Sequence, residues 1–241
     1  MQSARRNRHV NHFEPGRHAA ALDALPRDPA ELCAVVQGLL LHDHFGGLLY
    51  GAPPEGFAAA SRETLAVETR LDAILAANPA PLTSPRAPSA RAVGTCRDFA
   101  LLLAAFLRRQ GTPARVRCGF ADYFGPESEE GRWEDHWVCQ YRGQDGWRFA
   151  DAQLDRPHRE HLGIGFDPAV VPPGRFRPAH EIWRACQSGA IDPESCGHGK
   201  TAGAWFIQVN LQRDLLALDD ELVSAWDGWR SLSVIERRAD P

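Results

Sequence analysis

The sequence has 241 residues, of which 44% are hydrophobic and 24% charged, a balance typical of a globular protein with a substantial core. A formal net charge of −4 gives no broad basic field, so we expect no binding to nucleic acid or to a membrane surface. Six cysteines are too sparse for a disulfide framework, and the polar N-terminus contains no apolar signal-peptide core. We therefore expect a cytoplasmic protein with reduced thiols.

The first third of the chain predicts helices behind a polar arm. We expect residues 1–15 to form a flexible arm and residues 16–91 to form a helical N-terminal region. Asp28-Pro29 places a capping residue before a first-turn proline, which predicts a helix over 28–50. A second helix is predicted over 57–77, and the proline-rich residues 78–91 predict an irregular loop.

Residues 94–113 predict an amphipathic helix with a cysteine at its head. After Cys96, apolar residues recur at helical spacing, and Gly111 and Pro113 predict the end of the helix. Free backbone N–H groups and the positive end of the helix dipole favour the thiolate of a cysteine placed there. The same N–H groups can bind a developing oxyanion. Cys96 is therefore a candidate nucleophile.

Behind this helix the hydrophobic period changes from 3.6 to 2. Residues 114–120 predict a half-buried strand with Arg115 and Arg117 on its polar face. A polar loop follows, and two further strands are predicted over 136–142 and 147–153.

The rest of the chain predicts irregular structure and then helices. We expect residues 154–180 to be largely irregular, and a helical region to begin near His180 and to resume over 211–229. We assign residues 92–180 to the core and 181–241 to a C-terminal helical region, with 16–241 forming one compact unit.

His136 and Asp151 lie on the two strands of the predicted hairpin. A two-residue loop over 143–144 would place the two residues directly opposite each other. All even-length loops keep them on the same face of the sheet, because side chains alternate with a period of two, whereas a three-residue loop would separate them.

The register itself stays open at this point. A loop over 145–146 has the stronger turn signal and would place His136 opposite Asp155, and a four-residue loop over 143–146 would place it opposite Gln153. Asp155 is therefore the reserve candidate for the acid that orients the histidine.

A thiolate acyl-transfer site needs an imidazole and a group that orients it. Cys96, His136 and Asp151 supply this set as a candidate catalytic triad. Trp133 and Trp137 flank the histidine and are candidates for a substrate-binding wall. The Cys96 N–H is the expected oxyanion donor, and candidates for the second donor are Asn78, Thr95, His42 and His44.

The chain predicts no metal site and no cofactor. His42 and His44 would point about 200° apart on a helix, so they would not chelate one ion. Cys186, Cys196 and His198 match no standard zinc spacing. No acidic ligand loop is present, so we expect no calcium dependence.

The segment GTCRDFALLLAAFLRRQGTPARVRCGF resembles the cysteine motif of the transglutaminase-like superfamily. DHWVCQYR and WRFADAQLD resemble the strands that carry the histidine and the aspartate in that family, and the resemblance covers about residues 94–155. It implies an α+β fold with a papain-like core, in which the cysteine helix packs on an antiparallel sheet. The helical N- and C-terminal extensions resemble those of small bacterial stand-alone members.

The resemblance also implies a class of chemistry. Members act through a thioester acyl-enzyme, so we expect acyl transfer or hydrolysis at an amide, peptide or thioester carbonyl by Cys96, His136 and Asp151. The substrate would be a small-molecule, peptide or thioester-linked acyl group. The alternative is a catalytically silent binding or scaffold protein on the same fold.

Overall fold

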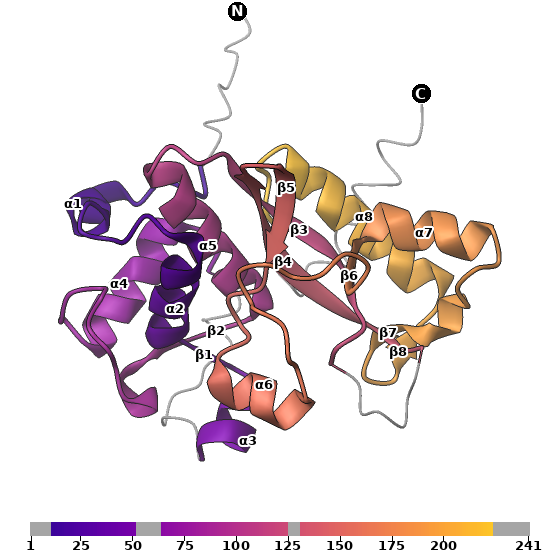
Figure 1. Ribbon diagram of the computed structural model, residues 1–241, viewed down its shortest axis with the longest axis horizontal. Coiled ribbons are helices and arrows are strands. Elements are labelled where there is room, and N and C mark those ends of the chain that lie inside the picture. Colours follow the sequence, from indigo (N-terminus) through magenta and orange to yellow (C-terminus); the bar gives the residue numbers. More distant parts are fainter. Residues whose placement is uncertain (1–10, 52–63, 125–130, 224–241) are drawn as a thin grey trace, which may run out of the picture.

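The computed structural model describes residues 11–51, 64–124 and 131–223 (Figure 1). Most of the predicted arm, the start of the helix predicted over 57–77 and the end of the one predicted over 211–229 lie outside these residues. No helix within the described ranges is both long and apolar enough to cross a membrane. The helices are α1 (Ala19–Leu22), α2 (Pro29–Leu39), α3 (Phe45–Tyr50), α4 (Val67–Ala77), α5 (Cys96–Arg109), α6 (Arg156–Leu162), α7 (Ala179–Gln187) and α8 (Ala204–Leu218), with single 3-10 turns at Gly16–His18, Pro88–Ala90 and Pro193–Ser195.

A six-stranded sheet forms the centre of the fold. Its strands are β3 (Ala114–Ala121), β4 (Trp133–Gly143), β5 (Gly146–Ala150), β6 (Phe176–Pro178), β7 (Cys196–His198) and β8 (Thr201–Ala202). The order is β6-β3-β4-β7-β8, β5 also pairs with β4, and every pairing is antiparallel except that of β4 with β7. Helix α5 packs on one face of the sheet and α8 on the other (Figure 1). The expected α+β fold, with the cysteine helix on an antiparallel sheet, is confirmed.

Helix α5 buries the apolar stripe that its sequence predicts. The five stripe residues are at most 2% exposed and pack against the apolar side chains of β3 and β4. The helix ends at Arg109, and Gly111 then adopts a φ of 84°, a left-handed conformation that glycine tolerates best. The stripe residues are Phe99, Leu102, Leu103, Phe106 and Leu107.

The helix predicted over 28–50 is interrupted by a strand. Leu40 is extended, and residues 40–42 form β1 (Leu40–His42), which pairs in parallel with β2 (Ala92–Gly94). The prediction failed because it read only local periodicity, whereas the backbone groups of β1 bond to a segment 52 positions away, as in Leu40 with Ala92. This ladder positions the chain just before α5.

The segment predicted to be irregular over 154–180 contains a helix. Asp155 caps α6 by accepting a hydrogen bond from the His158 N–H, and Gly163 ends the helix with a φ of 64°. Pro157 falls in the first turn, where its missing N–H costs nothing.

The half-buried strand predicted over 114–120 is buried on both faces. Arg117 is 4% exposed, because its guanidinium forms a bidentate pair with Asp214 of α8 at 2.8 and 2.7 Å. A charged residue on a strand therefore did not mark a solvent-exposed face here.

A buried carboxylate holds the beginning of α5. Asp98 accepts a hydrogen bond from the Thr95 N–H at 2.7 Å and pairs with Arg70 of α4 at 3.0 Å and with Arg97 at 3.4 Å. Asp98 and both arginines are at most 2% exposed. Arg70 also donates to the Val93 carbonyl at 2.5 Å, which ties α4 to β2.

We expect Asp98→Asn to destabilise the protein by about 3–5 kcal/mol, because it removes the carboxylate that two buried guanidinium groups share. Urea unfolding in reducing buffer measures this change. The control is Glu160→Gln, which breaks the exposed pair with Arg156 and should leave the midpoint unchanged. Equal midpoints for Asp98→Asn and the native protein would contradict this assignment.

Candidate active site

The nucleophile candidate Cys96 occupies the first position of α5. Strand β2 leads into it, Thr95 is the extended N-cap residue, and Asp98 fixes the Thr95 N–H. The Cys96 side chain is partly exposed and lines a cavity, whereas most of α5 is buried. The thiol therefore stands where helix N–H groups meet accessible space.

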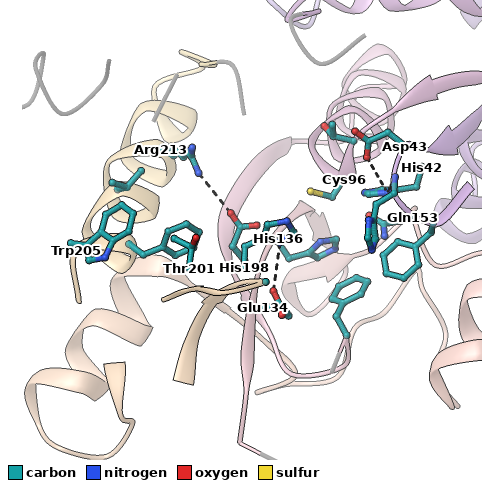
Figure 2. A pocket seen from close by; sticks show the side chains of 18 residues that line it. His42, Asp43, Cys96, Glu134, His136, Gln153, His198, Thr201, Trp205 and Arg213 are labelled. Carbon is teal, nitrogen blue, oxygen red and sulfur yellow. Dashed lines mark hydrogen bonds and ion pairs between the residues drawn. The ribbon is translucent and has the colours of Figure 1, made fainter. Parts of the chain in front are cut away.

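His136 connects this thiol to Asp151. His136 lies on β4 and is 2% exposed, and its Nε2 is 2.7 Å from Asp151 Oδ2. Cys96 lies near enough to contribute to the raised pKa of the imidazole, and both residues line the same cavity. Because Nε2 faces Asp151, Nδ1 is the nitrogen left for the sulfur. Figure 2 shows the Cys96 sulfur beside His136 on one wall of the cavity.

The surroundings of His136 stabilise its protonated form. Burial disfavours the charged imidazolium, but the charge and hydrogen bond of Asp151, with a further contribution from Cys96, outweigh it and raise the pKa of His136 to about 10. His136 is then protonated at neutral pH. An imidazolium beside a thiol stabilises the thiolate as one half of an ion pair.

The Asp151 carboxylate is surrounded by donors. Besides His136, its Oδ2 accepts the Tyr123 hydroxyl at 2.8 Å, and its Oδ1 accepts the Gln153 N–H at 3.1 Å. The Asp151 N–H donates to the Pro168 carbonyl at 2.7 Å. Burial raises the pKa of Tyr123, and Asp151 adds to the effect, so this phenol remains a donor.

The register of the hairpin explains how Asp151 reaches His136. Gly143 pairs with Gly146 and Cys139 with Ala150, and β5 ends there. Continued in this register, His136 would face residue 153, as in the four-residue-loop alternative, although the connection itself is tighter. Asp151 lies two positions earlier on the same face and makes the contact diagonally. The parity of the hairpin was therefore sufficient to predict that His136 and Asp151 lie on the same face.

The reserve candidate Asp155 bonds to residues other than His136. Besides capping α6, it contacts His158 Nδ1 at 2.7 Å and accepts the Tyr50 hydroxyl, and Arg91 lies 3.5 Å away. These partners connect α3 and α6, and Asp155 does not contact His136.

A cavity of about 460 Å³ opens beside Cys96 and His136. On one side it is bounded by His42, His44 and Phe45 at the β1–α3 connection. On the other side it is bounded by the β7–β8 hairpin and α8. Figure 2 shows Trp205, Thr201 and Arg213 on this second side, with Cys96 and Gln153 on the first.

Two ion pairs line the side of the cavity next to α8. Arg213 Nη1 is 3.7 Å from Asp135 Oδ2, and His198 Nδ1 is 3.6 Å from Glu134 Oε2. The hydrogen bond to Glu134 raises the pKa of His198. The charges on this side are therefore paired, and the apolar side chains of Trp205, Phe206 and Val209 line it as well.

The two tryptophans predicted to form a substrate wall do not line the cavity, so that prediction is corrected. Trp137 is 3% exposed and lies in the core beneath α5. Trp133 packs with the side chains of α7 and α8, and the Arg177 guanidinium lies over its ring. The aromatic lining comes instead from Phe45, Phe124, Trp205 and Phe206.

Of the candidates for the second oxyanion donor, some line the cavity and one does not. Thr95, His42 and His44 line the cavity, whereas Asn78 caps α4 and does not. His42 ends β1 and His44 follows in a turn, so the helical geometry used to separate their imidazoles was wrong. Among the described residues, no group of three or more His, Cys, Asp or Glu side chains is placed to hold a metal ion.

Sequence reasoning missed two aromatic neighbours of the histidine and one further residue of the cavity, Gln153. Tyr123 and Phe124 fall in the predicted polar loop, yet their rings lie 6.1 and 4.5 Å from the His136 ring, between centroids. Two adjacent aromatic residues directly after a strand were the available signal. Gln153 was considered only as the residue that one hairpin register would place opposite His136.

Comparisons with known proteins show what the chain is similar to. Residues 53–152 match the family model of the Transglutaminase-like superfamily, so the resemblance is confirmed over that segment, which contains Cys96, His136 and Asp151. No curated protein matches the chain. A matching solved structure, described as a candidate cysteine protease from Cytophaga hutchinsonii, has 15% identity and a TM-score of 0.36. The match covers 70% of this chain and 43% of that one, so this chain spans less than half of that protein.

We expect Tyr123→Phe to destabilise the protein by about 2 kcal/mol, because its hydroxyl donates to a buried carboxylate. Tyr141→Phe is the matched control, since that hydroxyl donates to the neutral Ala169 carbonyl and should contribute about 1 kcal/mol. Chemical unfolding of both variants measures the difference. A smaller loss for Tyr123→Phe than for Tyr141→Phe would contradict a strong hydrogen bond from Tyr123 to Asp151.

The raised pKa of His136 predicts a pH-dependent stability. Its contribution is fully present below the ordinary value of 6.5 and is lost as pH rises through about 10. The difference in unfolding free energy between the native protein and His136→Gln should therefore be larger at pH 6 than at pH 10.5. Urea unfolding at both pH values measures it, and a difference that does not change with pH would refute the prediction.

Proposed function

We propose that this protein is an enzyme in which the Cys96 thiolate attacks an amide, peptide or thioester carbonyl and carries the acyl group as a thioester. The observation that supports this most is the placement of Cys96 beside His136, whose imidazole bonds to Asp151, on the wall of a cavity. The match to the transglutaminase-like superfamily supports cysteine-based catalysis in general.

In the first half of the reaction the Cys96 sulfur forms a bond to the carbonyl carbon. The electron pair of the carbonyl moves onto its oxygen, where the N–H groups at the start of α5 stabilise the negative charge. The oxyanion then re-forms the carbonyl, the bond to the leaving amine or thiol breaks, and His136 donates its proton to that group. An acyl thioester on Cys96 and a neutral imidazole result.

In the second half water or an amine attacks the thioester. The neutral His136 takes the proton of the attacking group, the carbon–sulfur bond breaks, and Cys96 leaves as a thiolate beside the imidazolium. Water gives hydrolysis and an amine gives acyl transfer. The cavity extends to both sides of Cys96, which leaves space for an acyl group and for a leaving or accepting group.

Asp151 and its neighbours position the histidine. The carboxylate fixes the ring through Nε2, and the Tyr123 hydroxyl fixes the carboxylate. The Phe124 ring lies 4.5 Å from the His136 ring, between centroids, and lines the cavity. The volume of about 460 Å³ lies within the roughly 300–1,000 Å³ typical of sites for small ligands. We therefore propose a substrate whose reacting part is small, such as a single side chain or a small acyl group.

We expect iodoacetamide near pH 6 to label Cys96 at least about tenfold faster than Cys186, because only Cys96 has an imidazolium partner. Cys186 is also partly exposed and serves as the internal reference, and burial raises its pKa. His136→Gln should abolish the preference while its amide retains a donor for Asp151. Mass spectrometry of tryptic peptides gives both rates.

A melting temperature within a few degrees of the native one shows that His136→Gln is folded. If native Cys96 reacts no faster than Cys186, the enzyme proposal fails. The protein would then be a silent binding or scaffold member of the fold.

A further inference from the structure

Gln153 is a buried polar residue whose side chain the fold does not use. It is 1% exposed, follows β5 in the turn before α6, and lines the cavity beside Cys96. Its Oε1 is buried and has no hydrogen-bond partner among the described residues. Its backbone N–H, in contrast, donates to Asp151. The backbone of Gln153 therefore supports the site, whereas its carboxamide oxygen has no partner among the described residues of the fold.

A buried amide oxygen without a donor destabilises a folded protein. Methionine has nearly the same length and shape and would fill this position without that loss. The neighbouring His136 Nε2, Asp151 carboxylate and Tyr123 hydroxyl all have partners. An unmet buried acceptor needs an explanation, and on the wall of a cavity a ligand can supply the missing donor.

The surroundings favour a specific hydrogen bond at this position. Figure 2 places Gln153 near His42 and Cys96, away from α8. The aromatic rings of Phe45 and Phe124 line the same side, with their centroids 6.1 Å apart. Because Gln153 is itself 1% exposed, a donor supplied by a substrate would replace no strong hydration of the carboxamide oxygen.

We propose that Gln153 recognises the N–H of an amide in the substrate, at or next to the carbonyl that Cys96 attacks. A primary carboxamide or a peptide unit carries such a donor within one or two bonds of its carbonyl, whereas the reacting centre of a thioester or an ester carries none. This inference rests on the proposed function and narrows its substrate class to amides. Gln153 is two residues from Asp151, which holds the recognising group close to the reacting atoms.

The test compares two electrophiles that share a carbon–iodine bond and differ in their carbonyl group. Iodoacetamide carries N–H donors, and methyl iodoacetate carries none. We expect Gln153→Met to lower the ratio of the two Cys96 alkylation rates, amide over ester, by about three- to tenfold. The melting temperature should stay the same or rise, because the variant removes an unmet buried acceptor.

Gln110→Met is the matched control. The Oε1 of Gln110 is also buried without a partner, but Gln110 lies at the far end of α5 and its Nε2 donates to the Leu25 carbonyl at 3.1 Å and to the Pro26 carbonyl. We expect this variant to melt at a lower temperature and to keep the native rate ratio.

The outcomes separate the inference from the function on which it rests. Rapid alkylation of Cys96 with an unchanged ratio in Gln153→Met overturns the recognition of amides and leaves the enzyme proposal standing. A Gln153→Met protein that melts clearly lower or does not fold also overturns it, since the side chain would then serve the fold. If native Cys96 reacts no faster than Cys186 with either reagent, the proposed function fails and the inference fails with it.

Discussion

One buried carboxylate determines where the nucleophile candidate stands. Asp98 accepts the Thr95 N–H and pairs with Arg70, so the first turn of α5 is tied to a helix of the N-terminal region. Charges buried away from water tolerate little displacement, because any lost contact leaves a desolvated ion without compensation. The backbone is also close here, since a Cβ on Gly94 would lie 3.0 Å from the Asp98 Cβ. Helix α4 of the N-terminal region therefore helps to position Cys96.

The sheet holds the second candidate catalytic residue, His136, in place. His136 lies on β4, and Asp151 holds its imidazole while accepting further hydrogen bonds from Tyr123 and from a backbone N–H. Because this carboxylate is buried, its lone pairs need these donors in place of water. The thiol and the imidazole thus come from two separately anchored elements, and they meet only when α5 packs on β4. A site of this kind is as rigid as that packing.

The sequence predicted those features whose cause is local. The helix that begins at Cys96 follows from a 3.6-residue period, and the shared face of His136 and Asp151 follows from parity, which no even change of register alters. The missed features have distant causes. Arg117 is buried because Asp214, 97 positions later, neutralises it, and β1 exists because β2 offers backbone partners. Neither partner is visible in a local window, so polarity and periodicity indicated an exposed face and a longer helix.

In the turn after β5, the backbone and the side chain of Gln153 have different roles. The Gln153 N–H completes the shell of the Asp151 carboxylate, so this part of residue 153 is needed for the geometry of the site. Its carboxamide makes no such contribution, and its oxygen has no partner among the described residues. A residue whose backbone is structurally required can still vary in its side chain without moving the carboxylate. Recognition of the substrate can therefore change at residue 153 while the contact between His136 and Asp151 stays fixed.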